Sequence, residues 1–171
     1  MMNFSQPSLH SLYEVFDNAV LAWGLIACGL AQLSKLLVEI VQYRKWRPSV
    51  LLETGGMPSS HSAFVTGIAS GVGIQFGFDQ PGFAISAMVA FVVMYDASGI
   101  RRASGLTAAR VNQFPIENWV DPPINPLKES LGHTRLEVFV GSLIGPAIAL
   151  PGIFFVGSPL HLVQMLGIAF G

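Results

Sequence analysis

Five apolar stretches constrain the fold of this chain more than any other feature of its sequence. They cover approximately residues 15–34, 63–78, 83–95, 138–155 and 160–170. A helix that crosses a bilayer needs about 20 apolar residues. The first and fourth stretches reach that length, the second and third do so only with their polar ends, and the fifth is short. Only 11% of the residues are charged, against about a quarter in soluble domains. The sequence therefore predicts an all-α, polytopic membrane helix bundle with about five transmembrane segments, formed as a single domain over residues 1–171.

The positive charges lie in only two of the four connections between these stretches. These connections hold Lys35, Arg44, Lys45, Arg47, Arg101, Arg102, Arg110, Lys128 and Arg135. By the positive-inside rule, both connections are expected to be cytoplasmic, with the N-terminus outside. A binding site for an anion would also gather cations, whichever side of the membrane it faced.

Several kinds of partner are not indicated by the sequence. The formal net charge of −1 gives no reason to expect binding to nucleic acid. Cys28 is the single cysteine, so an internal disulfide is ruled out. No spacing of Cys, His and Asp is typical of a metal site. We therefore expect neither a metal ion nor a cofactor.

The segment "GGMPSSHSAF", residues 55–64, is the most polar and bendable part of the chain. In a bilayer, backbone that is not helical must be buried in protein or face water. Two glycines and Pro58 interrupt the chain here, and Ser59 or Ser60 can cap the helix that follows. The free N–H groups of a helix start can bind an anion, and His61 could donate a proton to it. The alternative is a serine-capped helix with a histidine at the membrane interface.

A second polar cluster, "LKESLGHTRLEVF", opens the fourth apolar stretch. His133 and Glu137 are four residues apart, so on a helix their side chains share a face and can pair. A carboxylate on one imidazole nitrogen fixes the tautomer and leaves the other nitrogen free as a nucleophile. The alternative is a surface ion pair.

Both histidine clusters are expected at the same membrane face, among the cations that a phosphate would need. In phosphoryl transfer, one imidazole can attack phosphorus while the other protonates the leaving oxygen. Arg and Lys then stabilise the charge on the equatorial oxygens. The two clusters together therefore indicate phosphoryl transfer.

Three motifs resemble those of the type-2 phosphatidic acid phosphatase superfamily, relatives of the vanadium haloperoxidases, and look closest to a divergent branch. They are "GGMPSSHSA", "MYDASGIRRASG" and "LKESLGHTRLEVFVGSLIG", and the resemblance covers about residues 32–145. It implies that His133 is the nucleophile, that Glu137 replaces the usual aspartate as its orienting partner, and that His61 is the acid. Ser60 stands where the superfamily has glycine.

The cations match this pattern less well. The superfamily's first motif places a Lys seven residues before Arg-Pro, but the position seven before Arg47 is Ile40. Lys35 is twelve residues before Arg47, about 18 Å along an unbroken helix, so the two can share one phosphate only if the chain bends. The third motif's Arg would fall on Leu127, one position before Lys128. The candidates for binding the phosphate are Arg47, Lys35, Ser59, Ser60, Arg101, Arg102 and Lys128.

Asp96 follows directly after the third apolar stretch. A carboxylate at membrane depth is a candidate functional group. Asp96 could be a structural partner of Arg101 or Arg102, or it could orient one of them on the phosphate.

The sequence thus favours a metal-independent, acid-phosphatase-like enzyme embedded in the membrane. Its expected substrate is a phosphorylated lipid or a prenyl phosphate, whose tail the Gly-rich helices could admit. The main alternative is a non-catalytic membrane subunit or scaffold that keeps the fold, and a small transporter is a third. The chain could also form a homo-oligomer or a membrane complex.

Overall fold

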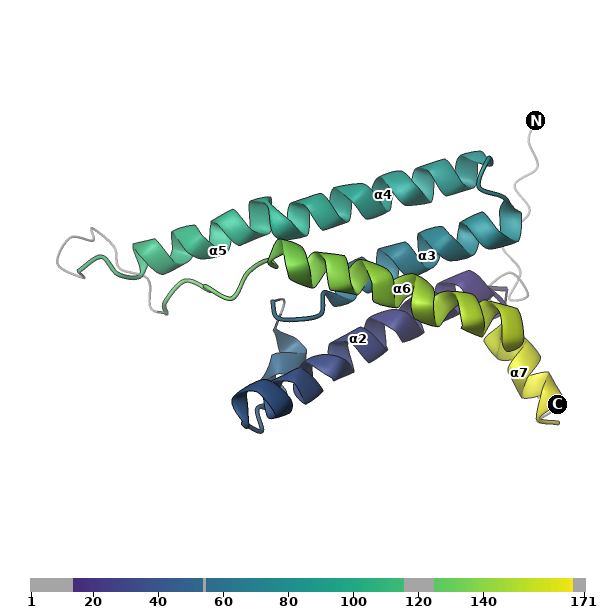
Figure 1. The fold of residues 1–171 in the computed structure, drawn as a ribbon, viewed down its shortest axis with the longest axis horizontal. Helices are drawn as coiled ribbons and strands as arrows, with labels where there is room; N and C mark the ends of the chain where they lie inside the picture. The colour runs from purple at the N-terminus through teal and green to yellow at the C-terminus, as the bar shows by residue number, and fades with distance from the viewer. Residues whose placement is uncertain (1–13, 54, 116–124, 168–171) are drawn as a thin grey trace, which may run out of the picture.

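The computed structural model describes residues 14–53, 55–115 and 125–167, and within these ranges the regular structure is entirely helical (Figure 1). The elements are α2 (Ala19–Tyr43), the short 3₁₀ helix η1 (Pro48–Leu52), α3 (Ser60–Phe76), α4 (Pro81–Ser98), α5 (Ile100–Val111), α6 (Arg135–Phe155) and α7 (Pro159–Met165). The central helix is α3, which packs against α2, α4 and α6 (Figure 1). The α-helical fold class predicted from the sequence is confirmed.

Among the described residues, three helical segments are long and apolar enough to cross a membrane: α2, the stretch Pro81–Val111 that comprises α4 and α5, and α6. The prediction of a polytopic membrane bundle agrees with these segments. α3 is somewhat shorter, with 17 residues. The fifth apolar stretch forms α7, which has only seven residues. α5 was not expected from the sequence, because its arginines interrupt the apolar pattern.

The interior of the bundle is built from very small side chains. Every buried hydrophobic residue among those described is an alanine or a valine. Large apolar side chains point outward instead, including Leu37, Phe91 and Phe139, which are 64%, 66% and 59% exposed. This arrangement suits a membrane protein, because small residues let helices approach closely while lipid covers the large ones.

The close contact between α3 and α6 brings the segments that begin these two helices next to each other. A Cβ atom on Gly141 would collide with the carbonyl of Ser59, and one on Gly145 would collide with the carbonyl of Ala63. At this close approach, the backbone N–H of Ser59 donates to the carbonyl of Glu137 at 3.1 Å. The first turn of α3 therefore lies beside the first turn of α6.

A break between α4 and α5 positions the segment that leads into α6. Gly99 has non-helical dihedrals of φ −105° and ψ −86°, and nearby the carbonyl of Ala97 accepts the N–H of His133 at 2.9 Å. Gly132, with φ +74°, lies so close to the backbone of Arg102 that a Cβ atom would collide with it. The backbone at His133 is thus fixed against the α4–α5 junction.

Candidate active site

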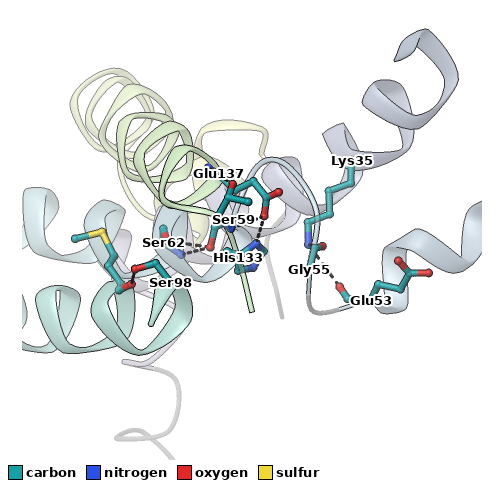
Figure 2. Close-up of polar contacts among 10 residues, drawn as sticks. Lys35, Glu53, Gly55, Ser59, Ser62, Ser98, His133 and Glu137 are labelled. Atoms are coloured by element: carbon teal, nitrogen blue, oxygen red, sulfur yellow. Dashed lines mark hydrogen bonds and ion pairs between the residues drawn. The ribbon is translucent and has the colours of Figure 1, made fainter. Parts of the chain in front are cut away.

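The imidazole of His133 is held by the first turn of α6. Its Nδ1 lies 3.0 Å from Oε2 of Glu137, which also accepts the backbone N–H of Thr134 at 3.2 Å. The hydroxyl of Thr134 in turn accepts the N–H of Glu137, which completes a capping box. Figure 2 shows His133 below Glu137, with Ser59 beside it. Because a carboxylate can only accept, Nδ1 carries the proton and Nε2 keeps its lone pair.

The other ring nitrogen of His133 is buried and unsatisfied. The side chain is 2% exposed, and Nε2 has no hydrogen-bond partner among the described residues. A buried polar atom without a partner is costly and is uncommon in native proteins. The Nε2 atom is therefore available to react with, or bind, something that enters beside it.

The surroundings keep His133 in its neutral form. Burial lowers the pKa of His133 below its ordinary value, and the positive charge of Lys35 lowers it further. The hydrogen bond to Glu137 acts in the opposite direction and raises this pKa, but burial is the largest effect. A neutral imidazole with a free nitrogen is the form required of a nucleophile.

Both histidines line one cavity of about 210 Å³, which we call the histidine cavity. Its lining consists of His61, Val92, Val93, Asp96, Ala97, Arg101 and His133. His61 comes from the first turn of α3. Nε of Arg101 donates to Asp96 Oδ2 at 2.8 Å, so this carboxylate holds the guanidinium at the cavity. The structure thus brings together His61, His133, Asp96 and Arg101.

The hydroxyl and the backbone N–H of Ser59 both form hydrogen bonds within the protein. As the N-cap of α3 it accepts the N–H of Ser62, and its hydroxyl also accepts the hydroxyl of Ser62 at 2.9 Å. Its own N–H is bonded to Glu137, and the residue is fully buried. The expected phosphate-binding role of Ser59 is therefore not supported by its contacts. Ser60, the first residue of α3, is also buried, at 4% exposure.

Lys35 lies deep in the bundle and reaches the loop that precedes α3. Its side chain is buried, with the ammonium 3.0 Å from the carbonyl oxygen of Gly55 and 3.5 Å from that of Glu53 (Figure 2). The chain does bend between Lys35 and Arg47, since α2 ends at Tyr43 and a left-handed residue, Arg44, follows. Lys35 therefore orients the backbone before the serine–histidine segment, within electrostatic range of His133.

Arg47 faces carboxylates instead of the histidines. It lies 3.0 Å from Glu39 and 3.3 Å from Glu53, and its side chain is 49% exposed. Arg47 and Lys35 do line one cavity, of about 510 Å³, which we call the lysine cavity. Glu137, whose carboxylate binds His133, lines the lysine cavity too.

Two further cations lie away from the histidines. Lys128 lines an open groove beside α5, together with Ala103 and Leu131. Arg102 is exposed and does not line the histidine cavity, in contrast to its neighbour Arg101. Of the cations predicted to bind phosphate, only Arg101 lines this cavity, and Lys35 lies near it.

Sequence reasoning missed three groups that shape the site. Glu39 and Glu53 neutralise Arg47, and the carbonyl of Ala97 fixes the backbone of His133. The two acids could have been suspected because each lies within eight positions of Arg47 in an otherwise basic segment. A backbone carbonyl leaves no sequence signal.

The described residues contain no group of three or more His, Cys, Asp or Glu side chains that could hold a metal ion.

Comparison with known proteins agrees with the resemblance carried by the motifs. A family model described as "Divergent PAP2 family" matches residues 16–148. The chain is also 37% identical over 155 residues to "Uncharacterized membrane protein YuiD" of Bacillus subtilis (strain 168), and the alignment covers 83% of this chain and 98% of that protein. No solved structure matches the chain significantly. With its three long apolar helices and a family match over most of its length, this chain is a membrane protein that belongs to the divergent PAP2 family.

Proposed function

We propose that the protein is a membrane-embedded phosphatase that hydrolyses a phosphorylated lipid or a prenyl phosphate through a phosphohistidine intermediate. One observation carries the proposal. His133 is anchored through Nδ1 to Glu137, while its buried Nε2 has no partner and lies at a cavity that His61 also lines. An oriented base with one free nitrogen beside a second imidazole is the arrangement that a double-displacement hydrolysis needs.

The first step forms a bond between Nε2 of His133 and phosphorus and breaks the bond from phosphorus to the lipid oxygen. His61, in its protonated form, gives its proton to that oxygen, so the lipid leaves as a neutral alcohol. In the second step, the now neutral His61 takes a proton from water, whose oxygen attacks phosphorus and releases His133. The products are inorganic phosphate and the alcohol, and both histidines return to their initial states.

The charge that develops on the phosphoryl oxygens needs cations near the histidine cavity. Arg101 lines this cavity directly, with Asp96 fixing its guanidinium. Lys35 lies nearby and lowers the pKa of His133 through its charge. We assign Arg101 as the main phosphate ligand and Asp96 as the residue that positions it.

The proposal is tested by measuring phosphate release from a panel of lipid and prenyl phosphates by purified protein, with His133→Ala as the comparison. We expect wild type to release phosphate in the presence of EDTA and to form an acid-labile phosphoenzyme. His133→Ala should do neither while keeping its helical circular dichroism. Phosphate release by a folded His133→Ala variant would refute the mechanism.

A second candidate, a non-catalytic membrane scaffold, is favoured by one specific observation. Arg47, which the superfamily pattern assigns to phosphate, is already bound by Glu39 and Glu53. The same panel distinguishes the two functions, because a scaffold would release no phosphate from any substrate.

A further inference from the structure

The histidine cavity is followed, along the same pair of helices, by a second cavity. This one measures about 300 Å³, and we call it the apolar cavity. Its lining consists of Leu21, Phe64, Val65, Ile68, Ser86 and Val89. Apart from the hydroxyl of Ser86, all of these side chains are apolar, and no charged group is among them.

The spacing of the lining residues places both cavities on one continuous face. On α3, Val65 and Ile68 lie four and seven residues after His61, which puts all three on one side of the helix. On α4, Val89 and Ser86 lie four and seven residues before Val93, which lines the histidine cavity. The two helices are antiparallel neighbours (Figure 1). The two cavities therefore form a row in the groove between α3 and α4, with the catalytic histidines at one end.

The groove is open toward the lipid. Val89 and Val92, which lie along it on α4, are 43% and 55% exposed, on a helix long and apolar enough to span a membrane. A hydrocarbon chain could therefore slide sideways from the bilayer into the groove without passing through water. Passage through water would expose apolar surface at a free-energy cost for every methylene.

We propose that the α3–α4 groove binds the hydrocarbon chain of the phosphorylated substrate. The phosphate would lie among His61, His133 and Arg101, and the chain would run past Val89 toward Ile68. The inference rests on the proposed function, since it takes the histidine cavity as the site of the phosphate. It adds the residues that select the substrate by the length of its chain. A long chain extends from the phosphate in the histidine cavity into the apolar cavity, whereas a short chain does not reach the apolar cavity.

Two variants of α4 distinguish loss of the chain-binding groove from a general disturbance of the helix by a large side chain. Val89→Trp fills the groove. Met88→Trp puts the same side chain on the neighbouring position, which is 56% exposed and lines neither cavity. We expect Val89→Trp to lower kcat/KM for dodecyl phosphate about tenfold, the low end of what a shape mismatch in an apolar pocket costs. Butyl phosphate should be hydrolysed as by wild type, and Met88→Trp should leave both substrates unaffected. Equal losses for the two substrates, or equal effects of the two variants, would overturn the groove.

A second measurement does not depend on turnover. A dodecylphosphonate with a diazirine at the end of its chain cannot be hydrolysed, and it can be crosslinked to the protein by light. We expect it to label residues 64–68 and 86–89 in wild type and in Met88→Trp, and to lose this label in Val89→Trp. Labelling of other helices, or labelling that Val89→Trp leaves unchanged, would refute the groove. If wild type hydrolyses no phosphate but labels as expected, the proposed catalysis fails and the groove stands.

Discussion

Glu137 has a different environment on each side of its carboxylate. One oxygen binds Nδ1 of His133, and the side chain, which is 19% exposed, also lines the lysine cavity. The residue therefore both fixes the tautomer of the buried imidazole and raises its pKa against the larger effect of burial. Its removal should change the rate of catalysis as well as its pH dependence.

Replacing Glu137 by Gln should lower kcat by about 10²–10⁴-fold, the range for a lost orienting partner. Because burial lowers the pKa of His133, the ring stays neutral in the folded protein down to pH values below about 6.5. The activity and stability that depend on the neutral ring are thus present above that pH and are lost as the pH falls through the lowered pKa. Without the carboxylate this pKa should fall further, so the acid limb of kcat/KM should move to lower pH. Measuring both proteins on one substrate cancels the titration of the substrate, and an unchanged limb would contradict the assignment.

His61 can be tested through the leaving group. A general acid matters most when the leaving oxygen is a poor leaving group, so His61→Ala should slow hydrolysis of an alkyl phosphate far more than that of p-nitrophenyl phosphate. The measurement is the ratio of the two losses in kcat/KM. A purely structural role for His61 predicts a ratio near one, because loss of folded protein affects both substrates equally.

At the scale of the helices, α3 and α6 depend on glycines that admit backbone contact. A methyl group on Gly145 would collide with the carbonyl of Ala63 and with Thr66, and backbone cannot move aside as a side chain can. Gly145→Ala should therefore destabilise the protein by about 1–3 kcal/mol, the usual cost of overpacking.

The matched control is Gly29→Ala, since nothing lies within 4 Å of a Cβ atom at this position of α2. At this position the higher helix propensity of Ala should leave the free energy of unfolding unchanged or raise it by up to about 1 kcal/mol. Thermal unfolding in detergent compares the two variants, and equal midpoints would mean that the α3–α6 contact is looser than described.

The helices and the contact between His133 and Glu137 were largely predictable from the sequence. Apolar stretches locate α2, α3, α4 and α6, because a bilayer demands long apolar runs, and the spacing of His133 and Glu137 predicts their contact. α5 could not be predicted in this way, because its polar sequence carries no membrane signal.

The placement of the cations was not predictable, because it depends on tertiary structure. The reversal of the chain after Tyr43 puts Lys35 beside the carbonyl of Gly55, while Arg47 meets two acids. Arg101, which lines the histidine cavity, comes two residues after the break between α4 and α5 at Gly99. The positions of these cations relative to the histidines are set by loops, whose geometry the pattern of apolar residues does not specify.

Over the whole molecule, the two ends of the bundle differ in charge. The turn between α3 and α4 contains Asp79 but no Lys or Arg, whereas seven of the nine basic residues lie in α5 or between Lys35, near the end of α2, and Arg47. We expect the basic end, with the histidine cavity, to be cytoplasmic.

Single cysteines at Asp79 and at Gln113, introduced on a Cys28→Ser background, should therefore react with an impermeant maleimide from opposite faces of the membrane. Both positions are exposed, so accessibility does not favour either one. Gln113→Cys should be labelled only after the membrane has been permeabilised, so that the maleimide can reach the cytoplasmic face. Labelling of Gln113→Cys from outside would show that the basic residues serve the substrate rather than orient the chain.

The hydrogen bond from His133 to the carbonyl of Ala97 has a consequence for biosynthesis. We expect His61 to be inserted with α3, early in translation, whereas His133 lies outside the helices, between α5 and α6, and its backbone is held by Ala97 of α4. In the proposed mechanism, a nascent chain that has inserted α2, α3 and α4 would hold the acid, His61, before the nucleophile, His133, is in place. We expect the imidazole of His133 to acquire its position only when α6 docks on α3, so the proposed activity would arise as the last long helix is delivered from the ribosome.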